Sequence, residues 1–180
     1  MGRVLFGVAV GLVLGPCLVL AWFQWGNPPV AVGDKPLPLE KLIVSVPMDA
    51  RISREIVKTP PIQPTEKNLI AGAEIFEEQC ASCHGSRGNS SYFGYEMYPK
   101  APQLWDEDRN GKGVGVSGHP AGEIYWKVSQ GIRLTGMPAF HDILTEKQIW
   151  QVSLLLANAN KPLPRQAAAL VSGQTPETAH

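Results

Sequence analysis

The sequence has few cysteines, few charged residues and no surplus of either charge. Three cysteines in 180 residues are too few and too unevenly placed for a disulfide scaffold. Lys+Arg and Asp+Glu both number 16, so the basic surplus of a nucleic-acid-binding protein is absent. Charged residues make up 18% of the chain, below the ~25% usual for soluble domains. Glycine (18) and proline (16) are plentiful, which favours long loops over a helical bundle or a large sheet.

Residues 4–23 form an uncharged apolar run near the N-terminus. Twenty residues of helix span about 30 Å, the thickness of the hydrocarbon core of a bilayer. Trp22 and Trp25 lie at one end, where an aromatic belt is expected. Arg3 and the terminal amine are the only positive charges before the run, and the next is Lys35. The positive-inside rule therefore predicts a cytoplasmic N-terminus, with the rest of the chain on the periplasmic side of a bacterial inner membrane.

Two alternatives to a single-pass anchor over residues 1–23 fit less well. A cleaved signal peptide needs a shorter apolar region and a small-x-small site, whereas Trp-Phe-Gln-Trp follows Ala21. A lipoprotein signal at Cys17 is disfavoured because Pro16 precedes the cysteine and the apolar run continues beyond it. We interpret Cys17 as a small apolar residue in lipid.

Three glycines of this run, Gly7, Gly11 and Gly15, repeat every four residues. Such a stripe lets a second helix approach closely, from another copy or another subunit. Glycine is also simply common in membrane helices, and the sequence leaves both interpretations open.

The next segment, residues 24–64, contains eight of the 16 prolines. Proline lacks a backbone donor and disrupts helices and strands, so this segment is predicted to be an extended linker. A short helix within residues 48–57 fits between the prolines.

Residues 65–160 carry the helix signals of a small domain. Thr65 is placed to cap a helix over residues 66–80. Pro120 and Gly131 suit the first turn and the end of a second helix. Thr145 and Gln148 have capping-box spacing before a third. The loops between these helices are long, so the core is small, and residues 161–180 are predicted to be a C-terminal tail.

The domain contains one Cys-Ala-Ser-Cys-His motif, from Cys80 to His84. Cys80 and Cys83 are about one helical turn apart, which puts two thiols on one side for thioether bonds to a haem, and His84 follows as an iron ligand. A thioredoxin-type pair would need a βαβ context, and a zinc site would need two further ligands at paired spacing. His119 and His141 do not have that spacing. We therefore predict covalently attached haem c.

The segments GAEIFEEQCASCHG, APQL and GIRLTGMPAF, in this order before a Trp-bearing terminal helix, resemble a class I monohaem bacterial cytochrome c. The likeness covers residues 65–160. It implies an all-α fold around one haem, with thioethers at Cys80 and Cys83 and His84 as the proximal ligand. It implies Met137 as the sixth ligand, and Pro102 against His84 with a nearby carbonyl accepting the imidazole N–H. Both His84 and Met137 would thus be metal ligands.

The resemblance also implies a helix crossing. Gly72 would allow the first helix of the domain to approach the last one closely, and Phe76 and Trp150 would fill the crossing.

Four other side chains compete with Met137 for the sixth position: Met97, His119, His141 and His180. His141 is the most serious rival because it lies four residues from Met137. A histidine on a loop before a helix is more often a surface residue. We therefore assign the sixth position to Met137, which Gly136 and Pro138 hold on a stiff loop.

With both axial positions filled, the iron exchanges single electrons but does not readily bind a substrate. We expect an electron carrier rather than an enzyme, anchored in the membrane and exchanging electrons with redox partner proteins. One alternative is a fixed cytochrome c subunit of a larger respiratory or photosynthetic oxidoreductase complex. A haem enzyme or gas sensor is a further alternative, and it requires that Met137 leave the iron.

Overall fold

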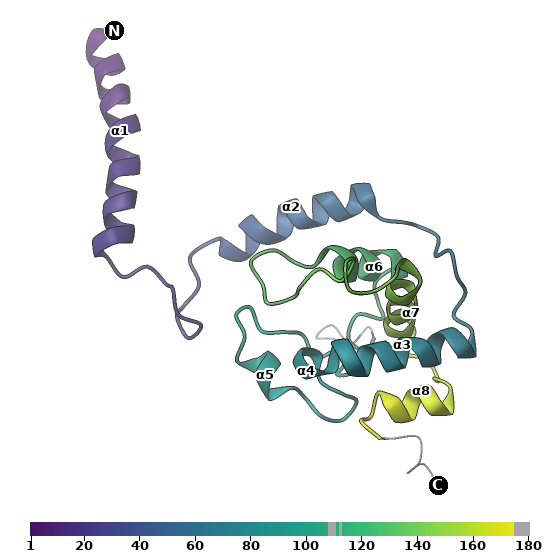
Figure 1. Ribbon diagram of the computed structural model, residues 1–180. Coiled ribbons are helices and arrows are strands. Elements are labelled where there is room, and N and C mark those ends of the chain that lie inside the picture. Colours follow the sequence, from purple (N-terminus) through teal and green to yellow (C-terminus); the bar gives the residue numbers. More distant parts are fainter. Residues whose placement is uncertain (108–110, 112, 175–180) are drawn as a thin grey trace. The chain divides into compact units, whose positions relative to one another are not determined.

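The structure is a computed structural model that describes residues 1–107, 111 and 113–174. The chain divides into two compact units, residues 1–42 and 43–180. All regular elements in the described residues are helices, as the predicted all-α class requires, with isolated bridges only at Ser86–Asn89 and Glu107–Val114. In chain order they are α1 (Gly2–Trp25), α2 (Glu40–Glu55), α3 (Glu66–Gln79), α4 (Ala81–His84), α5 (Tyr92–Tyr95), α6 (Ala121–Gln130), α7 (Glu146–Ala157) and α8 (Arg165–Leu170), all labelled in Figure 1.

The first unit contains α1, which is long and apolar enough to cross a membrane. None of its side chains is buried within the chain. The glycine stripe lies open, because a Cβ added at Gly7, Gly11 or Gly15 would meet nothing within 4 Å among the described residues. A helix with apolar side chains all round is stable when lipid or a partner helix surrounds it.

Helix α2 is longer than the sequence predicts and runs through Pro47. Proline removes one hydrogen bond to the carbonyl four residues earlier. Pro47 is exposed, and so is Ile43, whose carbonyl loses that bond and can be solvated by water. The helix also gains contacts within the second unit, where Ile52 is buried and the Trp126 indole N–H donates to Glu55 Oε2 at 2.8 Å. Part of the predicted linker is therefore tied to α6 through the side chains of Glu55 and Arg51, both of which contact Trp126.

Helices α3 and α7 cross at the centre of the second unit, and both begin as predicted. The Thr65 and Thr145 side chains accept hydrogen bonds from the backbone N–H groups of Asn68 and Gln148, and Gln148 completes the capping box. A Cβ at Gly72 would lie 2.4 Å from the Gln151 carbonyl oxygen of α7. The expected close approach at Gly72 is therefore confirmed.

Four aromatic rings surround this crossing. Phe76 and Trp150 are fully buried. Phe76 meets Trp105 edge-on at a centroid distance of 5.4 Å, and Trp150 stacks on Tyr125 of α6 at 4.2 Å. Each ring thus contacts a partner from another part of the chain, which ties the loop after α5 and helix α6 to the crossing.

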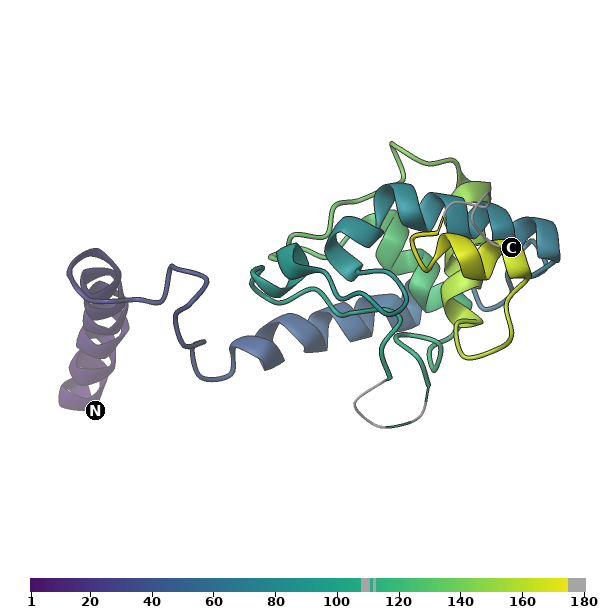
Figure 2. The ribbon, with the colours of Figure 1, turned by 90° about the horizontal axis from the view of Figure 1, so that it is seen from below.

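Helix α6 starts after Pro120 and ends at Gly131, as the sequence predicts, whereas α8 was not expected. It lies in the segment predicted as a tail and packs beside α3 (Figures 1 and 2). Ala167 and Val171 are completely buried there. Small apolar residues after Pro164 were the available signal, since proline ends one helix and readily precedes another.

Candidate functional site

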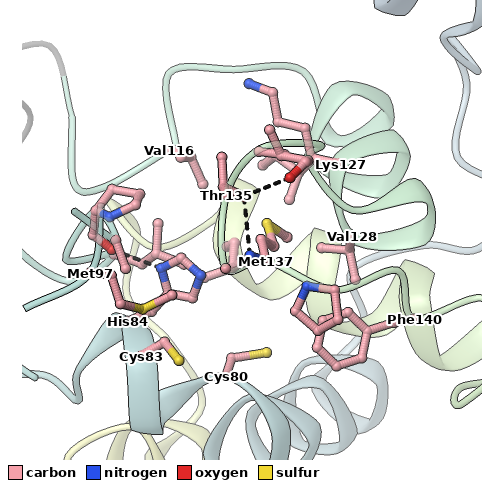
Figure 3. A pocket seen from close by; sticks show the side chains of 18 of the residues that line it. Cys80, Cys83, His84, Met97, Val116, Lys127, Val128, Thr135, Met137 and Phe140 are labelled. Carbon is pink, nitrogen blue, oxygen red and sulfur yellow. Dashed lines mark hydrogen bonds between the residues drawn. The ribbon is translucent and has the colours of Figure 1, made fainter. Parts of the chain in front are cut away.

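One cavity of the second unit is lined by all five residues that the sequence selects. Cys80, Cys83, His84, Pro102 and Met137 all lie on its wall. Figure 3 shows the two cysteines at one edge and Met137 further inside. Most of the remaining wall is apolar.

The end of α3 and the single turn of α4 set the geometry of the cysteine motif. Cys80 ends α3, and its carbonyl accepts hydrogen bonds from the N–H groups of Cys83 (3.1 Å) and His84 (2.9 Å). This turn places both sulfurs on the cavity side (Figure 3). Burial, reinforced by the neighbouring Cys83, raises the pKa of the Cys80 thiol to about 12. A half-buried thiol with a raised pKa is unlike the low-pKa cysteine of a thioredoxin-type pair.

His84 is oriented by the backbone carbonyl of Pro102, which lies in the returning part of the loop after α4. Its Nδ1–H donates to the Pro102 carbonyl at 2.8 Å, because a carbonyl oxygen only accepts. Nε2 is then the unprotonated nitrogen, available to a metal. Burial lowers the pKa of His84, and the hydrogen bond to Pro102 opposes this only in part, so the ring is neutral at neutral pH.

Gly85 makes this hydrogen bond geometrically feasible. Its φ of +70° turns the chain sharply after His84, and a Cβ there would lie 2.5 Å from Gln103 Oε1. The loop that begins at Gly85 therefore returns to place Pro102 beside the imidazole.

Met137 sits at the end of a loop closed by its own hydrogen bonds. The Ile132 carbonyl accepts from the Thr135 hydroxyl at 2.6 Å, and Thr135 Oγ1 accepts from the Met137 N–H at 3.1 Å. The Ile132 N–H donates to the Met137 carbonyl at 3.3 Å. The loop thus keeps its shape and directs Met137 towards the cavity (Figure 3).

Of the three rival ligands that the structure describes, only His141 is separated from the cavity by its position. His141 does not line the cavity: its Nδ1 pairs with the Ser129 carbonyl at 2.9 Å and its Nε2 lies 3.2 Å from Asp142. His119 and Met97 do line it. His180 lies outside the described residues.

A small ionic cluster stands at the cavity wall and was not anticipated from the sequence. Glu123 Oε1 lies 2.6 Å from Lys127 Nζ and 2.9 Å from His119 Nδ1. Burial alone raises the pKa of Glu123, but the hydrogen bonds and charges of Lys127 and His119 outweigh it, so that the net pKa is lowered. The i, i+4 spacing of the three residues on or next to α6 was the available signal.

These residues fit a covalently held haem. Two thiols lie at one edge, an imidazole nitrogen and a thioether sulfur face the same space, and apolar side chains make up most of the wall. A bare metal ion is not matched in the described part of the chain, where no group of three or more His, Cys, Asp or Glu side chains converges. The donor set of the described residues therefore fits a haem better than a bare metal ion.

Comparison with known proteins also indicates a haem protein. Residues 67–154 match the family model described as cytochrome c oxidase, cbb3-type, subunit III. The chain carries a cytochrome c domain. Together with α1, which is long and apolar enough to cross a membrane, this domain resembles a membrane-anchored cytochrome c of the class I type.

Two individual proteins are similar to this cytochrome c. The cbb3-type cytochrome c oxidase subunit FixP of Sinorhizobium medicae (strain WSM419) is 32% identical over 107 residues, which cover 55% of this chain. The chain spans about a third (32%) of the length of that relative. A chain of the Kuenenia stuttgartiensis reducing HAO-like protein complex matches 78% of this chain and 54% of its own length, at 20% identity and a TM-score of 0.42. That likeness is too weak to carry an argument.

Proposed function

We propose that this cytochrome passes single electrons between redox partner proteins through one haem c held by Cys80 and Cys83. In this proposal His84 and Met137 are the axial ligands. The observation that carries it is the convergence of these four side chains on one largely apolar cavity. The haem supplies an iron that changes its oxidation state by one electron.

Each of these side chains has a distinct part in the proposed transfer. His84, fixed by Pro102, presents a neutral nitrogen without any proton movement. Met137 offers a soft, uncharged sulfur, which favours the reduced state and raises the potential. With both side chains bound to the iron, no position would be left for a substrate, and the haem would exchange an electron with little rearrangement.

The proposed location is the bacterial inner membrane, with α1 crossing once and the haem domain on the periplasmic side. It rests on the apolar length of α1 and on Arg3 at its start. Without Arg3, 15 basic and 16 acidic residues lie outside the cytoplasm, a net charge of −1. Long-range steering is therefore weak, and we infer that partners dock weakly through a local surface near the haem.

Replacement of the proposed sixth ligand tests the function. We expect Met137→Ala to keep the haem attached but to lose the sulfur-to-iron charge-transfer band, to lower the midpoint potential and to bind CO when reduced. His141→Ala is the matched control on the same loop and should leave all three properties unchanged, since His141 faces away from the cavity. An unchanged spectrum in Met137→Ala would exclude Met137 as the ligand.

A second candidate is a fixed subunit of a membrane oxidoreductase complex. Two comparisons favour it: the family description and the name of the Sinorhizobium relative both refer to a subunit of a cbb3-type cytochrome c oxidase. The open stripe of Gly7, Gly11 and Gly15 offers a close-packing face for another helix.

Gentle detergent extraction from the native membrane distinguishes the two candidates. A free carrier elutes alone when haem absorbance is followed through size-exclusion chromatography. A fixed subunit elutes with other membrane proteins in constant ratio, and Gly11→Leu should release it.

A further inference from the structure

Met97 is a second methionine on the wall of the cavity that contains Met137 (Figure 3). It comes from a different part of the chain, the segment between α5 and Pro102. The same segment supplies the carbonyl that orients His84. Met97 therefore belongs to the histidine side of the site, whereas Met137 belongs to the loop after α6.

The Met97 side chain lies directly against the loop that carries Met137. A Cβ added at Gly136 would lie 1.9 Å from Met97 Cε and 3.6 Å from its Sδ. Among the described residues these are the only non-adjacent atoms within 4 Å of that position. Gly136 is next to Met137 in the chain, so Met97 is packed one residue away from the proposed sixth ligand.

The contact is mechanically important because, in the described part of the chain, the hydrogen bonds of residues 132–137 are internal, whereas only the end of the loop is tied to α6, where the Phe140 N–H donates to the Val128 carbonyl at 3.1 Å. Thr135 bonds to Ile132 and Met137, and Ile132 bonds to Met137. These bonds fix the shape of the loop but not its position relative to His84. Leu134, at the tip, is 75% exposed and gives little further support.

We propose that Met97 is a positioning residue for Met137. Its thioether side chain rests on Gly136 and keeps the loop closed towards the segment that holds His84, so that the spacing of the two axial ligands is maintained. A methionine side chain suits this task because it is flexible and fills irregular gaps. The inference rests on the proposed ligation by His84 and Met137.

Competition by imidazole for the sixth position tests the proposal in the full-length oxidised holoprotein in detergent. Binding is followed by loss of the sulfur-to-iron charge-transfer band. Met97→Ala should strengthen imidazole binding by roughly tenfold, because removing a packed side chain loosens the loop. Met97→Leu keeps the volume and should stay within about twofold of wild type. Leu134→Ala, on the same loop but exposed, is the control without an expected effect.

Gly136→Ala provides a second test with Met97 intact, in case Met97→Ala fails to fold. Its methyl group has to displace Met97 Cε, so imidazole binding should again strengthen. The proposal would be overturned if Met97→Ala bound imidazole with wild-type affinity. If Met97→Ala does not fold, wild-type affinity in Gly136→Ala would overturn it instead. A Met97→Leu variant that behaves like Met97→Ala would also overturn it. If wild type itself lacks the charge-transfer band, the proposed ligation fails, which is a different result from an intact band with unchanged imidazole binding.

Discussion

The crossing of α3 and α7 at Gly72 makes a quantitative prediction for Gly72→Ala. The added Cβ would lie 2.4 Å from the Gln151 carbonyl oxygen, and ordinary contact begins at 3.4 Å. The helices would have to separate by the difference, 1.0 Å. Overpacking of a core costs about 1–3 kcal/mol, and the upper end applies here because backbone atoms cannot rotate away. Alanine returns about 1 kcal/mol of helix propensity, so the net loss of unfolding free energy is roughly 2 kcal/mol.

Thermal unfolding of the full-length holoprotein in detergent, followed by the haem absorbance, measures this loss. A change of roughly 2 kcal/mol corresponds to a fall in Tm of about 4–8 °C for a domain of this size. Glu74→Ala, on the exposed face of the same helix, should change Tm by no more than about 2 °C. An unchanged or higher Tm in Gly72→Ala, as propensity alone predicts, would refute the close crossing.

Two further predictions concern α8 and α2. Val171→Ala should lower the unfolding free energy by about 2–3 kcal/mol, because two fully buried methyl groups are lost and a cavity remains. Arg165→Ala, at an exposed position of α8, should have little effect. Thermal unfolding measures both variants, and equal Tm values would show that α8 does not pack on α3. The hydrogen bond from Trp126, followed by that from Arg51, lowers the pKa of Glu55 below its ordinary 4.5, so this contact should be fully present above pH 4.5 and lost as the pH falls through the lowered value. In wild type the NMR chemical shift of the Trp126 indole proton should follow the titration of Glu55, and in Glu55→Gln this titration step should vanish; a step that persists would assign it to another group.

The helix boundaries show what local sequence can predict. A threonine with a donor three residues later fixes the start of a helix through hydrogen bonds between near neighbours. Thr65 and Thr145 therefore gave the starts of α3 and α7 correctly. Gly131 likewise ended α6, since its φ of +66° suits glycine.

The sequence failed where distant contacts outweigh local preference. Pro47 argues for a break, yet α2 continues through it, and Ile52 and Glu55 of that helix make contacts within the second unit. The α8 segment consists of good helix formers after Pro164, but only the burial of Ala167 and Val171 makes it part of the domain core instead of a tail. The helix propensity of a single residue is easily exceeded by the free energy gained when a few side chains are buried.

The candidate site likewise has one part that local sequence determines and another that depends on tertiary packing. The Cys80–His84 motif is compact enough for one helical turn to place its donors, so the sequence by itself determined that edge of the site. The position of Met137 beside it, and the separation of His141 from it, were decided by the tertiary structure. So was the contact between Met97 and Gly136, because side chains from two separate loops meet only after the chain has folded around the cavity. Short-range geometry is written into residue order, whereas contacts between distant segments depend on how the whole core packs.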